Sequence, residues 1–122
     1  MASMDVTRFN STYNFKTAVV FYPGCGLYNA FGGLSASTWK PYGPFVILIG
    51  SADKVVSPAY CQTRVSRAQQ LGASGVGITI FPNAHHSFDM ATSVTATFTQ
   101  DDVDAKAAAD QQAMQFFAAR LH

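Results

Sequence analysis

Two side chains that can cooperate in acid–base chemistry follow two apolar stretches of this chain. Asp53 comes shortly after the run 45–49, and His86 comes shortly after the run 76–81. If these runs are neighbouring parallel strands, ~4.8 Å apart, both side chains lie at the same edge of one sheet. A carboxylate in that position can hold an imidazole in one tautomer, as it does in a nucleophile–His–Asp triad. The pattern therefore predicts Asp53 and His86 as two members of such a triad.

Each of these residues also has a simpler interpretation. Asp53 follows Gly50 and could be an ordinary turn aspartate, while a loop histidine is often a plain surface residue. His85 and His86 could together bind a metal ion, but neighbours on an extended segment point to opposite sides and seldom face one ion. We therefore expect no metal site, and because the glycines match no phosphate-binding loop we also expect no cofactor.

The third member of a triad, the nucleophile, has no matching sequence pattern. A hydrolase elbow reads Gly-x-Ser/Cys-x-Gly between a strand and a helix. The segment 24–26 lacks that spacing, and the segment 72–75 lies between a helix and a strand, which is the wrong order. Ser35 and Ser37 lie in a long loop without an elbow. The sequence therefore predicts poor or no catalysis by this chain alone.

The elements that must position the two side chains alternate along the chain. The predicted elements are strands at 18–22, 45–49 and 76–81 and helices at 58–71 and 101–121. The strands are continuous apolar runs, which are typical of a parallel sheet covered on both faces. The sequence therefore predicts an α/β fold with a small three-stranded parallel sheet flanked by helices.

The predicted helices have recognisable ends and apolar faces. Ser57 is an N-cap residue, followed by proline at the first helical position. The apolar face of the first helix is predicted to comprise Val65, Ala68 and Leu71, and that of the last helix Val103, Ala107, Met114, Phe117 and Leu121. Residues 1–15 are predicted to be irregular, and residues 23–44 to form a long loop.

Composition restricts the classes of protein that fit. The 122 residues allow one domain, 1–122, and a net charge of +1 without a basic stripe argues against nucleic-acid binding. No apolar run is long enough to span a membrane, and the first residues lack a secretory signal pattern, so we expect a cytoplasmic location. Cys25 and Cys61 have no metal-ligand spacing, and we expect two reduced thiols.

Three segments, Phe21–Gly26, Phe45–Asp53 and Phe81–Asp89, occur in a characteristic order and spacing. Together they resemble the C-terminal half of dienelactone hydrolase-like α/β hydrolases, over about residues 15–121. The resemblance implies ester or lactone hydrolysis, with Asp53 and His86 as triad residues. It implies His86 over His85 because a small residue and Phe follow it. The family's nucleophile elbow and oxyanion-hole strand lie upstream of these segments, where this chain has a short polar stretch.

Two functions follow from these observations. The first is a hydrolase-family domain that retains the triad Asp and His and is weak or inactive alone towards small esters or lactones. The second is a non-catalytic, self-associating or small-ligand-binding module. The strand at 18–22 is apolar throughout, with Lys16 as its nearby charge, so its edge is expected to pair with a second copy. The sequence thus predicts a homodimer that pairs near residues 17–34.

Overall fold

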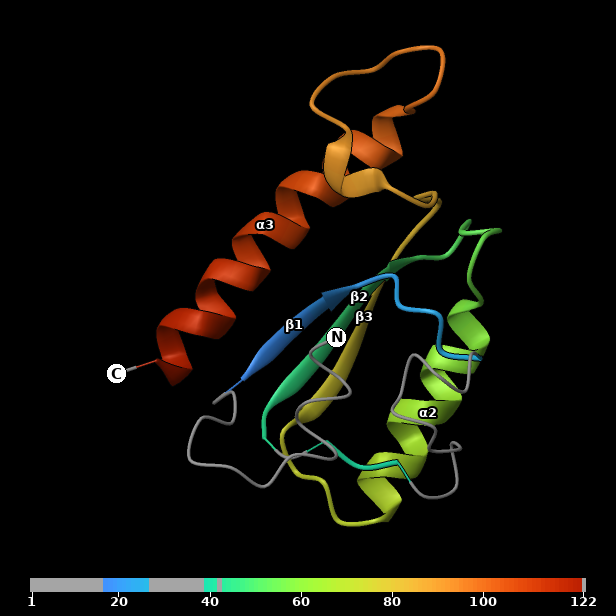
Figure 1. Ribbon diagram of the computed structural model, residues 1–122. Coiled ribbons are helices and arrows are strands. Elements are labelled where there is room, and N and C mark those ends of the chain that lie inside the picture. Colours follow the sequence, from blue (N-terminus) through green and yellow to red (C-terminus); the bar gives the residue numbers. More distant parts are fainter. Residues whose placement is uncertain (1–16, 27–38, 42, 122) are drawn as a thin grey trace.

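The computed structural model describes residues 17–26, 39–41 and 43–121 of the chain (Figure 1). The elements in chain order are β1 Ala18–Phe21, β2 Phe45–Gly50, α2 Pro58–Gln70, β3 Val76–Phe81, the 3-10 helix η2 Phe88–Met90 and α3 Gln100–Arg120. The expectations for residues 1–15 and for most of the long loop at 23–44 fall outside the described residues. The loop predicted after β3 contains η2, which the sequence did not indicate.

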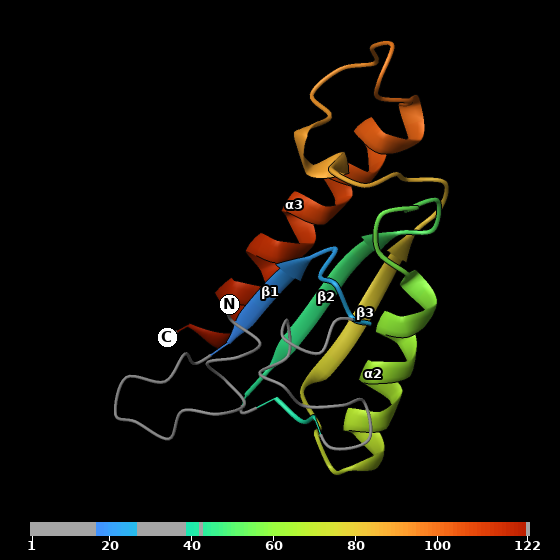
Figure 2. The same cartoon turned by 45° about the vertical axis from the view of Figure 1, so that its right-hand side comes forward.

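The three strands form one parallel sheet in the order β1-β2-β3 (Figure 2). Strand β2 is central, and in the register its Ile47 lies beside Val20 of β1 and Ile78 of β3. All six residues of β2 are buried because the strand has a neighbour on each edge and a helix on each face. The predicted small parallel sheet with flanking helices is confirmed.

Successive side chains of β2 point to opposite faces of the sheet and so belong to two separate core layers. On one face, α2 packs against the sheet, and this layer contains Phe45, Ile47, Ile49, Cys61, Val65 and Ala68. On the other face α3 covers a layer that contains Val46, Leu48, Phe81, Phe88, Ala105 and Ala109. Figure 1 shows α2 and α3 on opposite sides of the strands. Because helices cover both faces of the sheet, the residues on both faces of its central strand must be apolar, which explains the continuous apolar run.

The predicted apolar face of α3 is wrong. Met114 is 74% exposed and Leu121 is 51% exposed, while the buried residues of the helix are Asp102, Ala105 and Ala109. Alanines allow the helix to lie close to the bulky phenylalanines of the α3 layer, so small residues rather than large apolar ones mark its inner face. In α2, Val65 and Ala68 are buried as predicted, whereas Leu71 is the C-cap residue and is 43% exposed.

The expectation of two reduced thiols is also wrong, because Cys25 and Cys61 form a disulfide. Cys25 follows β1, and Cys61 lies in the first turn of α2, 36 residues further along the chain. The sheet brings these two points to the same face, with a Cα–Cα distance of 5.0 Å. Of the helices in the described part of the chain, none combines the length and apolar character that crossing a membrane requires.

Candidate functional site

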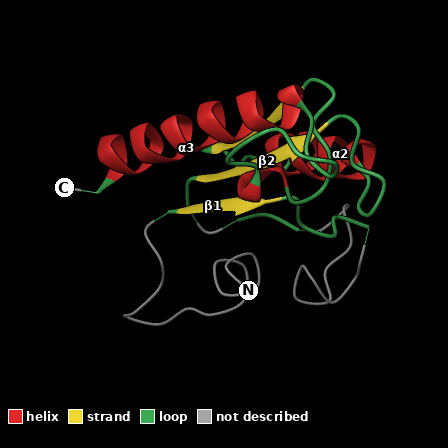
Figure 3. Cartoon of the chain, turned by 90° about the horizontal axis from the view of Figure 1, so that it is seen from above, coloured by secondary structure: helices red, strands yellow, loops and turns green. Residues whose placement is uncertain are grey.

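The carboxyl ends of the three strands bring Tyr22, Asp53 and His86 to one edge of the sheet. Tyr22 directly follows β1, Asp53 lies in the turn after β2, and His86 lies in the loop after β3. Figure 3 shows the connecting loops gathered at this end of the strands. Sites in α/β proteins are commonly built in this position, because the loops there are anchored by neighbouring strands.

Asp53 is held on both of its carboxylate oxygens. Its Oδ1 accepts hydrogen bonds from the backbone N–H groups of Val55 at 2.8 Å and Val56 at 2.9 Å. Its Oδ2 lies 2.8 Å from His86 Nδ1, and its side chain is completely buried. Asp53 is therefore both a turn aspartate and a partner of His86, as the sequence allowed. One carboxylate oxygen serves each contact.

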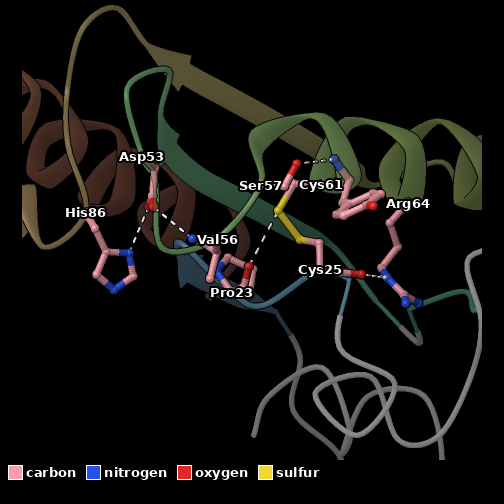
Figure 4. The surroundings of a disulfide bond; sticks show 9 residues. Pro23, Cys25, Asp53, Val56, Ser57, Cys61, Arg64 and His86 are labelled. Carbon is pink, nitrogen blue, oxygen red and sulfur yellow. Dashed lines mark hydrogen bonds and ion pairs between the residues drawn. A yellow bond between two sulfur atoms is a disulfide. The ribbon is translucent and has the colours of Figure 1, made fainter.

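His86 presents one ring nitrogen to Asp53 and the other away from it (Figure 4). An ionised carboxylate can only accept hydrogen bonds, so in the neutral form of the imidazole Nδ1 carries the proton and Nε2 holds a lone pair. The side chain is 29% exposed, which leaves part of the ring open while the contact with Asp53 is buried. An imidazole in this tautomer is suited to accept a proton at Nε2 as a general base.

The two loops that carry Asp53 and His86 are in direct backbone contact. The N–H of Ala52 donates to the carbonyl of Ala84 at 3.0 Å. At Gly50, a Cβ atom would lie 2.0 Å from the Ala84 carbonyl oxygen, so the approach needs a residue without a side chain. The glycine after β2 therefore sets how closely the two loops approach each other.

His85 has its own carboxylate partner. Its Nδ1 lies 3.2 Å from both oxygens of Asp102, and its side chain is 48% exposed. Asp102 also accepts from the His85 N–H at 2.7 Å and from the Thr99 N–H at 2.8 Å, which completes the N-terminal cap of α3. This second pair thus joins the loop after β3 to the start of a helix.

The pKa of Asp102 reflects these contacts. Burial by itself would raise the pKa, but the hydrogen bonds from His85 and Thr99 outweigh burial and hold the pKa below its usual value. A buried carboxylate that accepts several N–H bonds is stabilised in its charged form. Asp102 is therefore ionised where it caps the helix.

The sequence did not single out Tyr22, although the residue lies in one of the family-like segments. Its ring centroid is 4.3 Å from that of His86, and its hydroxyl donates a hydrogen bond to Asp89. Burial, followed by the contact with Asp89, raises the pKa of Tyr22 to about 12. Sequence reasoning missed Tyr22 because its partner Asp89 is 67 residues away along the chain, and only the fold brings the two together.

Nucleophile and metal chemistry have few candidates in the described part of the chain. Cys25 and Cys61 are joined in the disulfide, so neither is a thiolate. Ser74 precedes β3 and so lies at the opposite end of the strand from His86. Among the residues that the structure describes, no group of three His, Cys, Asp or Glu side chains could hold a metal ion.

Hollows in the surface are small near the pair. A cavity of about 280 Å³ lies beside the Asp53 turn, lined by Gly24, Cys25, Gly26, Val55, Val56, Ser57 and Tyr60. A larger groove of about 670 Å³ runs between α2 and β3. The smaller cavity adjoins the candidate site, because its walls include Val55 and Val56, whose N–H groups bind Asp53.

Comparison with solved structures identifies the fold as that of α/β hydrolases. A Klebsiella pneumoniae subsp. pneumoniae protein named "Putative Dienelactone Hydrolase" is 19% identical, with a TM-score of 0.52 over 64% of this chain and 30% of that chain. Thermogutta terrifontis esterase 2, phosphoramylated by tabun, is 17% identical, with a TM-score of 0.65 over 97% of this chain and 49% of that chain. Its propionate-bound structure gives 16% identity and a TM-score of 0.65 over 96% and 50% of the two chains.

These similarities confirm the resemblance to dienelactone hydrolase-like α/β hydrolases at the level of fold. The chain spans about half the length of the esterase and 30% of the Klebsiella protein. No protein-family model matches the sequence, and no curated protein matches it.

Proposed function

We propose that this chain carries the acid–base half of an ester-hydrolysing site, with Asp53 and His86 as its catalytic residues. The observation that carries the proposal is the 2.8 Å contact between His86 Nδ1 and the buried Asp53 carboxylate, at the carboxyl edge of the sheet. The similarity of the fold to an esterase and to a protein named as a dienelactone hydrolase supports it.

In this proposal His86 transfers protons and Asp53 holds the imidazole in the required tautomer. A hydroxyl or thiol nucleophile attacks the ester carbonyl carbon and gives its proton to His86 Nε2, while Asp53 holds the proton on Nδ1. His86 then returns the proton to the departing alcohol, and water repeats the sequence to release the acid. Substrates of this kind are small carboxylic esters or lactones. Because no nucleophile elbow occurs in this sequence, the chain alone is weak or inactive.

Hydrolysis of p-nitrophenyl acetate by the full chain tests this proposal. We expect slow release of p-nitrophenol, because His86 Nε2 can take a proton from water as the water attacks the carbonyl carbon of an activated ester. His86→Gln and Asp53→Asn should lower the rate towards that of buffer. His85→Gln is the matched control, because it removes a neighbouring imidazole that also has a carboxylate partner, and it should keep most of the rate.

Two results would change this view. Rates that are equal in all four proteins would exclude a role for the pair in this reaction. Fast turnover that His86→Gln abolishes would instead support the catalytic role of the Asp53–His86 pair. It would also show that the chain holds a nucleophile of its own.

A cytoplasmic location fits the disulfide poorly. Cytosolic glutathione and thioredoxin keep most thiols reduced, whereas disulfides persist in oxidising compartments. The Cys25–Cys61 bond therefore favours a compartment of the second kind.

A further inference from the structure

Backbone strain in the described part of the chain is concentrated around the Asp53–His86 pair. The non-glycine residues with positive φ there are Tyr22 at 34°, Asn83 at 58° and Ser87 at 67°. Tyr22 is the least expected of the three, because asparagine enters this region readily and a bulky aromatic residue does not. Strained residues persist where the surrounding contacts over-determine them, and they cluster at functional sites.

The contacts of Tyr22 show what the strained backbone achieves. Its N–H donates to the Leu48 carbonyl at 2.8 Å, which fixes the residue at the end of β1. The ring then turns towards the loop after β3, where it lies against His86 with an interplanar angle of 54°. Phe21 and Phe88 lie edge-on to the same ring, with centroids 6.2 Å and 6.0 Å away. These contacts hold the Tyr22 ring in place independently of its contact with the imidazole of His86.

The hydroxyl fixes the other end of the Tyr22 side chain. It donates to Asp89 in η2, three residues beyond His86. Burial and the contact with Asp89 raise the pKa of Tyr22 to about 12, further above physiological pH than its ordinary value, so the phenol remains a hydrogen-bond donor. The loop that carries His86 is therefore tied to β1 at a point just beyond the histidine.

We propose that Tyr22 is a positioning residue for His86, which holds the imidazole ring against the Asp53 carboxylate. This inference rests on the proposed function of the pair. A hydrogen bond to Asp53 fixes one ring nitrogen but leaves the ring plane free to tilt about that contact, because the terminal torsion of histidine is broad. The Tyr22 ring restricts this tilt, so Nε2 keeps one direction.

The tautomer of His86 gives a direct test in the full chain, without any substrate. Proton–nitrogen correlation spectra of the imidazoles, at a pH where they are neutral, report the ratio of Nδ1–H to Nε2–H forms, and His85→Gln and His86→Gln variants assign the signals. We expect the native chain to show His86 with its proton on Nδ1. Tyr22→Leu should lower the Nδ1–H to Nε2–H ratio about two- to tenfold, which is the factor that an aromatic pair contributes.

Two milder variants separate positioning from a general loss of structure. Tyr22→Phe keeps the ring and removes the hydroxyl, and Asp89→Ala removes the acceptor of that same hydroxyl. Both should give the same intermediate ratio, and they decide the question if Tyr22→Leu fails to fold. Tyr60→Phe and Tyr60→Leu are the matched controls on an exposed tyrosine of α2 and should leave the ratio unchanged.

The outcomes are distinct for the two proposals. A native ratio in folded Tyr22→Leu, Tyr22→Phe and Asp89→Ala, as judged by circular dichroism, would overturn the role of Tyr22. A ratio that Asp53→Asn fails to change would instead overturn the pair itself, and with it the proposed function. A fall in Asp53→Asn together with graded falls in the Tyr22 variants supports both.

Discussion

Asp53 and Asp102 use the same chemistry for two different purposes. Each is buried, binds backbone N–H groups, and has a histidine Nδ1 within about hydrogen-bonding distance at 2.8 Å and 3.2 Å respectively. Asp53 lies at the carboxyl edge of the sheet, so its histidine lies among the loops that follow all three strands. Asp102 sits at the N-terminus of α3, where a negative charge is favourable and caps the helix. A buried His–Asp contact is therefore informative only together with its place in the fold.

At the residue scale we expect Asp102→Asn to destabilise the fold. The substitution weakens charge-assisted hydrogen bonds to His85 and Thr99, and we expect a loss of about 2 kcal/mol in the free energy of unfolding at neutral pH. Urea titrations of the two proteins, monitored by circular dichroism, measure this difference. Asp104→Asn is a suitable control, because Asp104 lies in the same helical turn with an exposed side chain.

The pH dependence of this effect has a definite sign. The folded-state pKa of Asp102 is lower than the unfolded value of 3.8, so its contribution to stability is fully present above pH 3.8. That contribution is lost as the pH falls through the lower, folded-state pKa. The difference between the native chain and Asp102→Asn should therefore shrink on acidification below pH 3.8. A difference that grows in acid would contradict the assignment.

At the scale of elements, the contact between the loops after β2 and β3 depends on Gly50. We expect Gly50→Ala to cost at least about 3 kcal/mol in stability, because an added methyl group meets the backbone of Ala84 and cannot be relieved by a rotamer change. Gly77→Ala is the matched control in β3, since a Cβ there has nothing within 4 Å, and it should change stability by less than about 1 kcal/mol. Thermal unfolding of both variants gives the comparison, and equal losses would refute this view of Gly50.

The elements themselves could be predicted from the sequence far better than their contacts. Each predicted strand lies within one residue of the observed strand, because a continuous apolar run ended by Gly or Pro is a local signal. The inner face of α3 could not be found in this way, since its buried residues are alanines and an aspartate that apolar periodicity does not mark.

Asp53 and His86 could be proposed because each lies in the loop that follows a predicted strand, and parallel strands bring their carboxyl ends together. Tyr22 and the disulfide could not, because each depends on a contact between segments that are distant in sequence. The strained backbone of Tyr22 also has no sequence signature, as tyrosine is unusual at positive φ.

At the scale of the whole molecule, β1 lies at one edge of the described sheet, and a homodimer through this edge remains a prediction. Ala18 donates its N–H to Pro44 and Tyr22 donates to Leu48, both towards β2. By the alternation of a parallel strand, the N–H of Val19 points away from β2. An outward-facing backbone donor on an apolar strand favours pairing with a second copy.

Light scattering from micromolar to millimolar concentration tests this dimer. We expect Val19→Pro to shift the native chain towards monomer, because proline removes the outward donor and is tolerated on edge strands. Val19→Thr keeps that N–H and should remain associated. A native chain that is monomeric throughout the range would exclude the dimer and the self-associating alternative function.

The disulfide also has a topological consequence. Cys25 and Cys61 close a covalent ring that contains β2, Gly50 and the Asp53 turn, while His86 lies outside it. A single break of the backbone between residues 26 and 60 leaves the two pieces joined through sulfur, so the aspartate cannot separate from the rest of the chain. A break between Cys61 and His86 has no such safeguard and divides the candidate site into two molecules. The two halves of one site thus differ in their resistance to proteolytic separation, although the side chains themselves are in contact.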